Sequence, residues 1–395
     1  MSQDRRLRIA VLNRTFAPTG GGAERYAIAL VEQLAARHEM HVFAQDLAHD
    51  WPGVTYHKVS KPFTKPRWVN QLWYATATWW ATRRGFDVVH SHENTWHGGV
   101  QTVHVLPVWH NLFYGRRGLK RVLRWTKVVF SPRLWTYLVL EQRRFANAAS
   151  LPDEPGQRHI VVTSDSLRSV MAKTFPATAP GLVVLSPGVD VPPAPATPLQ
   201  RAAARHSLGL PPQGSCVLLV GNDYRKKGLE RTLHGLTLLS KEVVLAVVGS
   251  SLQQPHFQAV AQGLGIAERV FFLGQLSDVT PAYRAADVLA HPTLEDTFAM
   301  VVLEAMAHGL PVVVSSAQYC GIAALLSDGK NALLLDDPLD AKALARALQR
   351  TLAEPGLSES LGRNARAFAL AHGWPEKARQ QEKLYYRSTG GSAAD

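Results

Sequence analysis

Short runs of apolar residues alternate along this chain with longer stretches whose apolar positions recur every three or four residues. This alternation is typical of parallel sheets built from βαβ units, in which strands are buried on both faces. In the first half it predicts strands at residues 8–13, 40–45, 87–92, 100–106 and 159–165. In the second half it predicts strands at residues 181–188, 215–222, 242–249, 269–275, 287–293 and 310–316. We therefore expect two doubly wound α/β sheets, one in each half.

Proline marks the expected connection between the halves. Residues 191–200, VPPAPATPLQ, contain four prolines, which neither a helix interior nor a central strand accepts. A last helix is predicted over 375–388, because Pro375 suits the first position of a helix. The expected organisation is an N-terminal domain, a second domain and a C-terminal helix with a tail that returns toward the N-terminal domain, over residues 1–185, 186–372 and 373–395.

The composition argues against membrane-spanning, secreted and cysteine-rich proteins. Of the 395 residues, 46% are hydrophobic and 19% charged, and no apolar stretch approaches the roughly 20 residues of a membrane span. The first apolar run ends at Asn13 and is too short for the core of a signal peptide, so we expect a cytoplasmic protein. Cys216 and Cys320 are too few for a disulfide framework or a Cys-rich zinc site.

The net charge of +12 is held by the first half. Residues 1–180 contain 24 Lys and Arg against 12 Asp and Glu, whereas residues 181–395 contain 19 of each. Two stretches of the first half, 61–85 and 115–147, mix these cations with Trp and aliphatic residues, as helices in a membrane interface do. We expect an anionic membrane surface as a partner; the alternative is a pair of core helices with a basic outer side.

A glycine-rich segment follows the first predicted strand. Gly20, Gly21 and Gly22 precede a helical pattern, so that backbone N–H groups and a helix N-terminus could face an anion. A dinucleotide-binding fingerprint is a competing interpretation, since Asp46 ends the second strand. However, Arg25 stands where that fingerprint needs its third glycine, which disfavours a dehydrogenase.

Three cations follow the strand predicted at 215–222. Arg225, Lys226 and Lys227 stand before Gly228 and another helical pattern. In open parallel sheets ligands bind beyond the carboxyl ends of strands, where Lys can serve a diphosphate as a point charge and Arg as a fork. The alternative is a solvated turn.

The strongest local signal lies in residues 291–314, HPTLEDTFAMVVLEAMAHGLPVVV. A strand delivers Glu295 and Asp296 to its end, and a helix predicted over 298–307 carries Glu304. Carboxylates in these places can accept hydrogen bonds from a polyhydroxylated ligand while helix N–H groups hold its phosphate. Glu304 stands among apolar residues and needs a partner; capping of a nearby turn is the alternative role.

Histidines gather in the first half, and His104 is the candidate with a function because it ends the strand predicted at 100–106. The others are given less weight: His90, His92, His97 and His110. The chain has no D-x-D motif and no His, Cys and Asp cluster with metal-ligand spacing. We therefore expect no metal and no other cofactor.

Taken together and in order, these motifs resemble the retaining glycosyltransferases of family 4, over almost the whole chain. The resemblance rests on GGGAER, DVVHSH, QTVH, SPGVD, VGNDYRKKGLERTL, AYRAADVLAHPT, LEAMAHGLPVVV, SDGKNALLL and the last helix. It implies the GT-B fold, in which two Rossmann-like domains face each other across a cleft. The second half is most similar to the lipopolysaccharide core glucosyltransferases.

The resemblance also implies roles for single residues. His104 would lie near the transferred sugar, Lys227 would neutralise the donor diphosphate, Asp296 would contact the donor sugar, and Glu304 would take the ribose hydroxyls. His104, Asp296 and Lys227 are the implied catalytic residues. The implied donor-binding set is Gly21, Gly22, Asn222, Arg225, Lys226, Lys227, Glu295, Asp296, Phe298, Ala299, Met300, Val301 and Glu304.

Three features depart from the family pattern. The first acid is Asp296 in place of Glu, so its reach is shorter and Glu295 could serve instead. Thr297 and Ala299 replace the glycines usual around Phe298. Asn222 stands where many members have Arg, so the cations at 225–227 take more of the phosphate charge.

The expected function is metal-independent, retaining transfer of a hexose from a nucleotide diphosphate sugar, UDP-glucose above others, to a lipid-linked or lipopolysaccharide glycan. The expected location is the cytoplasm, peripherally on the inner face of the cytoplasmic membrane. One alternative is a non-catalytic protein that binds sugar nucleotides or glycans. A nucleic-acid binder could use the same charge, but no recognised nucleic-acid motif is present.

Overall fold

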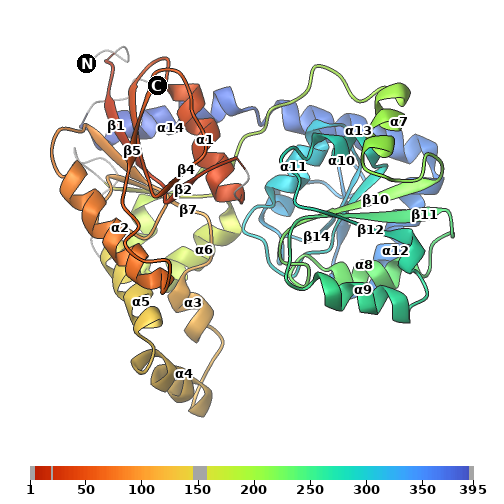
Figure 1. The fold of residues 1–395 in the computed structure, drawn as a ribbon, viewed down its shortest axis with the longest axis horizontal. Helices are drawn as coiled ribbons and strands as arrows, with labels where there is room; N and C mark the ends of the chain where they lie inside the picture. Colours follow the sequence, from red (N-terminus) through yellow and green to blue (C-terminus); the bar gives the residue numbers. More distant parts are fainter. Residues whose placement is uncertain (1–4, 19–20, 146–157, 391–395) are drawn as a thin grey trace. The chain divides into compact units, whose positions relative to one another are not determined.

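The computed structural model describes residues 5–18, 21–145 and 158–390, and it divides into two compact units (Figure 1). The N-terminal unit comprises Met1–Gly188 and Trp374–Asp395, and the C-terminal unit comprises Val189–Gly373. Each unit is an α/β sandwich around a parallel sheet, which confirms the predicted fold class. The unit boundaries follow residues 188 and 373, against 185 and 372 expected from the sequence.

The sheet of the N-terminal unit has seven parallel strands in the order β5-β3-β1-β6-β7-β8-β9, so the strand order reverses between β1 and β6. Its strands are β1 Arg8–Leu12, β3 Glu39–Ala44, β5 Val54–Lys58, β6 Val88–Ser91, β7 Val100–Val103, β8 His159–Val162 and β9 Leu182–Val184. A separate pair is formed by β2 Thr15–Phe16 and β4 Asp46–Leu47.

Helices cover this sheet, and three of them, α3, α4 and α5, project away from it (Figure 1). The helices are α1 Gly22–Leu34, α2 Arg67–Thr82, α3 Val108–Phe113, α4 Leu119–Val129, α5 Pro132–Phe145, α6 Asp165–Thr174, the 3₁₀ helix Pro176–Gly181 and α14 Trp374–Ser388. The last helix, α14, belongs to this unit because Tyr385 Oη lies 2.6 Å from His90 Nδ1 and Glu382 Oε1 lies 2.7 Å from His38 Nε2.

The sheet of the C-terminal unit has six parallel strands in the order β12-β11-β10-β13-β14-β15 and reverses between β10 and β13. Its strands are β10 Ser215–Val220, β11 Val243–Val248, β12 Val270–Gly274, β13 Val288–His291, β14 Val312–Ser315 and β15 Leu333–Leu335. Along β10, Cys216 and Leu218 enter one hydrophobic core while Val217 and Leu219 enter the other. Burial on both faces explains the continuous apolar runs.

The two cores are closed by helices on opposite faces of that sheet. These are α7 Pro198–Ser207, α8 Leu229–Leu236, α9 Gln254–Gly263, α10 Thr280–Ala285, α11 Met300–Ala307, α12 Ala341–Ala353 and α13 Pro355–Leu370, with 3₁₀ turns at Ala267–Arg269 and Gly321–Leu325. No described helix is both long and apolar enough to span a bilayer.

Several boundaries differ from those predicted. The strand predicted at 181–188 was assigned to the second half, but β9 pairs with β8 at the edge of the N-terminal sheet, because the chain after α6 returns beside that strand. The connection predicted at 191–200 ends early: α7 begins at Pro198, whose missing N–H costs nothing in a first turn. The strands β2, β4, β5 and β15 were not predicted, and the strand predicted at 100–106 ends at Val103.

Candidate functional site

The turn that follows β10 carries the cations at residues 225–227 and holds them near the end of that strand. A Cβ at Gly221 would collide with the side chain of Lys227, so glycine there leaves room for this lysine. Gly228 has a φ of +77°, and a Cβ on it would overlap the carbonyl oxygen of Pro292. The turn can therefore pack against the loop that follows β13.

Hydrogen bonds fasten these two segments to each other. The backbone carbonyl of Lys226 accepts from Leu294 N at 2.8 Å and from Thr293 Oγ1 at 3.1 Å. Ser315 Oγ, at the end of β14, donates to Thr293 O at 2.8 Å. Since β10 and β13 flank the reversal of strand order, the loops meet where ligands bind in open α/β sheets.

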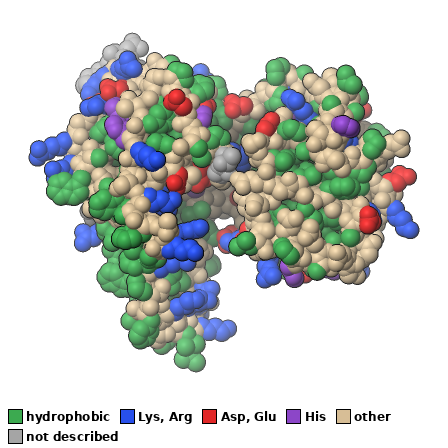
Figure 2. Space-filling model, in the orientation of Figure 1, with side chains coloured by type: hydrophobic (Ala, Val, Ile, Leu, Met, Phe, Trp, Pro, Cys, Tyr) green, Lys and Arg blue, Asp and Glu red, His purple; other side chains and the backbone are tan. Residues whose placement is uncertain are grey.

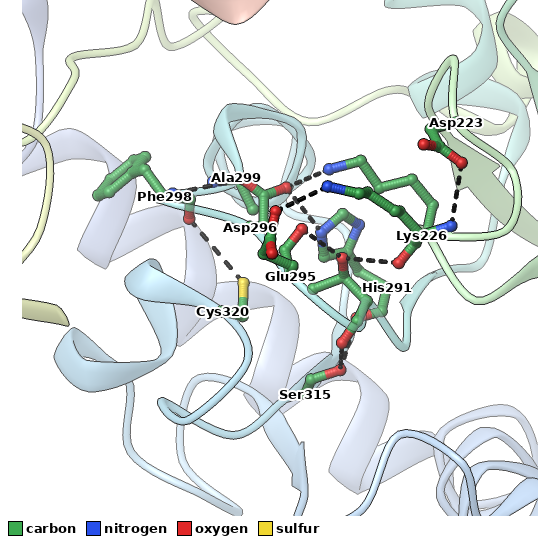
Figure 3. Close-up of polar contacts among 11 residues, drawn as sticks. Asp223, Lys226, His291, Glu295, Asp296, Phe298, Ala299, Ser315 and Cys320 are labelled. Carbon is green, nitrogen blue, oxygen red and sulfur yellow. Dashed lines mark hydrogen bonds and ion pairs between the residues drawn. The ribbon is translucent and has the colours of Figure 1, made fainter. Parts of the chain in front are cut away.

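Two ion pairs cross between the segments (Figure 3). In the outer pair Lys226 Nζ donates to Glu295 Oε1 at 2.7 Å, and about half of each side chain is exposed. In the inner pair Lys227 Nζ donates to Asp296 Oδ2, and the side chains are 21% and 14% exposed. Water screens the outer pair, so the inner pair carries most of the electrostatic energy.

Asp296 is surrounded by donors. Its Oδ1 accepts from the backbone N–H groups of Ala299, at 2.9 Å, and Phe298, at 3.3 Å, while His291 Nε2 lies 3.3 Å from its Oδ2. Burial alone would raise the pKa of this carboxyl, but the hydrogen bond from His291 and the charge of Lys227 hold the pKa well below its usual range. Asp296 is therefore ionised at neutral pH.

The helix α11 begins directly beside this carboxylate, two residues later than predicted. Ala299 precedes the helix with a φ of +72° and is the one non-glycine residue of positive φ in the described parts of the chain. Met300 and Val301 form the first turn, whose N–H groups have no partner inside the helix. In this structure the N–H of Ala299 donates to Asp296 Oδ1.

Three further residues of the expected donor-binding set, all in the C-terminal unit, have hydrogen-bond partners of their own. Glu304, on α11, accepts a 2.7 Å hydrogen bond from the Tyr283 hydroxyl of α10. Asn222 Oδ1 accepts from Ser250 N at 3.0 Å. Arg225 is exposed, and its backbone N–H donates to Gln253 Oε1 at 3.0 Å. These contacts show where the side chains lie and do not test their roles.

The candidates of the N-terminal unit lie at the carboxyl ends of its own strands. Gly21 is the N-cap of α1 and Gly22 its first residue, while Gly20 lies outside the described residues. His104 follows β7, with its Nε2 3.0 Å from Nδ1 of His92, and Tyr26 of α1 packs edge-on against its ring. Burial, with the charge of Arg144, lowers the pKa of His104 to about 3, so the ring is neutral at pH 7.

Two histidines in these sites were not among the residues predicted to function. His92 was given little weight, although it follows the strand next to the one that ends before His104. His291 was not considered, although a histidine that ends a strand five residues before Asp296 is a usable signal. Within the described residues, no three His, Cys, Asp or Glu side chains gather so as to hold a metal ion.

Two family models match the chain, one in each half. The model described as Glycosyltransferase Family 4 matches residues 20–192, and the model described as Glycosyl transferases group 1 matches residues 200–368. Together they cover the C-terminal sheet and the N-terminal sheet apart from β1.

Curated relatives match over part of their length. The chain is 32% identical over 273 residues to D-inositol 3-phosphate glycosyltransferase of Xylanimonas cellulosilytica, covering 62% of this chain and 64% of the relative. It is 31% identical over 188 residues to the lipopolysaccharide glucosyltransferase WaaG of Escherichia coli, covering 46% and 50%. The matched region thus spans between half and two thirds of these relatives.

Solved structures match over nearly the whole chain. The crystal structure of WaaG, a glycosyltransferase involved in lipopolysaccharide biosynthesis, aligns with a TM-score of 0.78 and 22% identity, covering 95% of this chain and 99% of that one. Anabaena HepE in complex with UDP-glucose aligns with a TM-score of 0.71 and 19% identity, covering 95% and 98%. At this level of identity the likeness shows the fold alone.

Proposed function

The chain belongs to the glycosyltransferases of GT-B fold, and we propose that it transfers a hexose from a nucleotide diphosphate sugar, UDP-glucose first, to a membrane-associated glycan. The observation that carries the proposal is the meeting of Lys226 and Lys227 with Glu295 and Asp296 at the reversal of strand order in the C-terminal sheet. Cations that can bind a diphosphate thus lie beside carboxylates that can accept hydrogen bonds from sugar hydroxyls.

The proposed reaction breaks the bond between the anomeric carbon of the sugar and the diphosphate oxygen. Lys227 and the first turn of α11 stabilise the negative charge that develops on the departing diphosphate. The acceptor hydroxyl attacks from the face that the diphosphate leaves, and a phosphate oxygen takes its proton, so the anomeric configuration is retained. Retention follows from the family resemblance, and no covalent carboxylate intermediate is required.

Glu304 and His104 complete the proposed machinery. Glu304 takes the ribose hydroxyls of the donor, for which Tyr283 holds its carboxylate in place. His104 contributes a neutral hydrogen-bonding group near the transferred sugar, because its pKa of about 3 keeps it uncharged at pH 7. Gly21 and Gly22 offer backbone N–H groups at the start of α1.

The choice of donor and acceptor is supported by the named relatives. HepE was solved with UDP-glucose, and WaaG is named a lipopolysaccharide glucosyltransferase. We therefore place UDP-glucose first among donors and a lipopolysaccharide core glycan first among acceptors.

Calorimetry of the protein against UDP-, GDP- and ADP-sugars tests the proposal. We expect heat of binding with UDP-glucose and its loss in Lys227→Ala. No binding of any sugar nucleotide by the folded protein would overturn the proposed function. Binding without sugar transfer to lipopolysaccharide core acceptors would favour the alternative, a non-catalytic protein that binds sugar nucleotides.

The helix α4 supplies the proposed membrane surface. Val128 is its only buried residue, and apolar side chains on and beside it lie in solvent: Leu119 is 73% exposed, Val129 65% and Phe130 84%. Figure 2 shows hydrophobic and cationic side chains together over the end of the N-terminal unit where α4 lies. Its cations are Lys120, Arg121, Arg124 and Lys127.

This combination fits an anionic lipid surface. The exposed apolar side chains can enter the interface while the cations meet the headgroups. The helix α2 adds exposed tryptophans, Trp73 at 44% and Trp80 at 56%, with Arg83 stacked 4.1 Å from the ring of Trp80. We propose peripheral binding to the inner face of the cytoplasmic membrane, where a lipid-linked acceptor is available.

A further inference from the structure

His291 is a completely buried titratable residue that the proposed reaction leaves without a role. It is the last residue of β13, and its side chain is 0% exposed. Its Nε2 lies 3.3 Å from Asp296 Oδ2 (Figure 3), while its Nδ1 has no hydrogen-bond partner among the described residues. One ring nitrogen thus faces the candidate site, and the other is buried without a hydrogen-bond partner among the described residues.

The unpartnered nitrogen determines which tautomer is present. A buried N–H without an acceptor is rarer and more costly than a buried nitrogen lone pair without a donor. The proton of the neutral ring therefore resides on Nε2, from which it is donated to Asp296. Burial lowers the pKa of His291, which agrees with a neutral ring at pH 7.

In the proposed reaction, not all of the donors around Asp296 keep their bonds to it. In this structure, Oδ1 accepts two backbone N–H groups, and Oδ2 accepts from Lys227 and His291. In the proposed reaction Lys227 turns toward the diphosphate. His291 is then the donor that still holds Oδ2.

We infer that His291 is a positioning residue of the donor site, whose Nε2–H orients the carboxylate of Asp296 and keeps it ionised while Lys227 serves the diphosphate. The consequence of this inference for donor binding rests on the proposed function. The hydrogen bond from His291 and its effect on the ionisation of Asp296 are independent of the proposed function.

The prediction for pH follows from the groups that face Asp296. These are Lys227 from the turn after β10, His291 from β13 and the thiol of Cys320 from the segment after β14, with the Lys226–Glu295 pair outside them. A carboxyl of depressed pKa is ionised at neutral pH and is protonated only as pH falls through that depressed value. Loss of the His291 donor raises the pKa of Asp296, so protonation occurs at higher pH.

The first test uses the unaltered protein. The ¹⁵N shifts of the His291 ring are expected to show a protonated Nε2 and an unprotonated Nδ1 at pH 7. The opposite tautomer, or a doubly protonated ring, would overturn the inference.

The second test compares His291→Leu, which removes the donor, with His291→Gln, which keeps an amide N–H near the position of Nε2. The ¹³C resonance of the Asp296 carboxyl, assigned by its absence in Asp296→Asn, is followed against pH. We expect the Leu variant to titrate about one pH unit or more above the unaltered protein, and the Gln variant to lie near it. Equal titration in all three proteins would refute the positioning role.

The matched control is His38→Leu. His38 is also buried and bonds a carboxylate, Glu382 Oε1 at 2.7 Å, in the N-terminal unit. This variant loses the same kind of bond and should leave the Asp296 titration unchanged.

The last test measures the affinity for the donor as a function of pH. We expect UDP-glucose binding by His291→Leu to fall at a higher pH than in the unaltered protein, with the Gln variant restored. If no sugar nucleotide binds the unaltered protein, the proposed function fails, while the ring tautomer and the carboxyl titration still decide the role of His291.

Discussion

The two units differ in net charge and in the ionisation of the side chains near their candidate sites. Residues 1–180 carry the whole net charge of +12, yet the histidines deepest in the N-terminal unit are neutral: burial lowers the pKa values of His90 and His104 to about 3. Residues 181–395 are balanced, yet ionised side chains stand partly buried at the end of β10, where Lys227 meets Asp296. The N-terminal unit thus carries the excess of cations, while the C-terminal unit places a paired cation and carboxylate at its candidate site.

This difference separates two kinds of recognition. Cations on an exposed helix attract any extended anionic surface, and their effect is screened by salt. Cations that are fixed by hydrogen bonds and paired with carboxylates select a small ligand. Such a ligand takes the place of the carboxylate at the cation and offers hydroxyl groups to the carboxylate. The N-terminal unit is therefore expected to govern where the protein binds, and the C-terminal unit which donor it holds.

The largest expected effect comes from removing the surface charge of the N-terminal unit. Replacing Lys120, Arg121, Arg124 and Lys127 with Gln should weaken binding to vesicles with anionic lipids by about 4 kcal/mol, at about 1 kcal/mol for each cation. Sedimentation with liposomes measures this, and calorimetry should show unchanged donor affinity. The matched control replaces four exposed cations of the C-terminal unit: Lys342, Arg346, Arg350 and Arg363. Equal losses in both variants would contradict a dedicated surface on α4.

The next prediction compares the contributions of the inner and the outer ion pair to stability. Lys227→Ala leaves Asp296 short of its cation and should destabilise the C-terminal unit by about 2 kcal/mol, less than the loss for a fully buried pair because part of each side chain is exposed. Lys226→Ala, whose pair is half exposed, should change stability by less than about 1 kcal/mol. Urea unfolding distinguishes them. Similar values for both would mean that burial does not separate the pairs.

Glu304 tests whether a carboxylate of the C-terminal unit contacts the nucleoside. Glu304→Ala should weaken donor binding by roughly 1.5 to 3 kcal/mol, the range for a charged hydrogen bond. Tyr283→Phe removes only the hydroxyl partner of Glu304 and keeps the acid, so its donor affinity should fall less. Unchanged nucleotide affinity in Glu304→Ala would count against the ribose role.

Ala299→Gly should stabilise the protein by up to about 1 kcal/mol. Alanine in the left-handed region costs roughly 1–2 kcal/mol, and the greater freedom of glycine in the unfolded chain offsets part of the relief. Ala305→Gly, inside α11, is the opposite control and should destabilise by at least about 1 kcal/mol. A shift of the thermal midpoint in the same direction for both would show that the backbone at Ala299 is not strained.

The smallest expected effect is that of chelators. Because Lys227 and the helix N–H groups supply the positive charge in the proposed reaction, EDTA should leave sugar transfer unchanged. A strict requirement for Mg²⁺ or Mn²⁺, restored by adding back the ion, would mean that the paired lysines do not carry the charge of the leaving diphosphate.

Much of the fold follows from the sequence because strands buried on both faces leave continuous apolar runs, as in β10 and β11. The assignment of a strand to a sheet is harder, since it depends on where the preceding connection returns; this is why the run at 181–188 was given to the wrong sheet. The exposed face of β5, which interrupts its apolar pattern, hid that strand altogether.

The candidate site, like the fold, could be predicted from the sequence only in part. The acids and cations could be predicted singly, because each follows a strand. Their pairing could not, since Lys226 and Glu295 are 69 residues apart and meet only through the packing of two loops. Alanine rarely adopts the left-handed backbone found at Ala299, so the one sign of it was the glycine usual at this position in the family pattern. His291 was overlooked among the apolar residues of β13, where the nearby Asp296 was the available sign.

The return of α14 to the N-terminal unit has a consequence for synthesis. Domains generally fold as units as they leave the ribosome, the first-made one first. Here the earlier sheet lacks Tyr385 and Glu382, the partners of His90 and His38, until the chain beyond Gly373 has been made. The C-terminal unit, translated as one uninterrupted piece, can complete its core sooner. The N-terminal unit can therefore be completed only after the whole C-terminal unit has been translated.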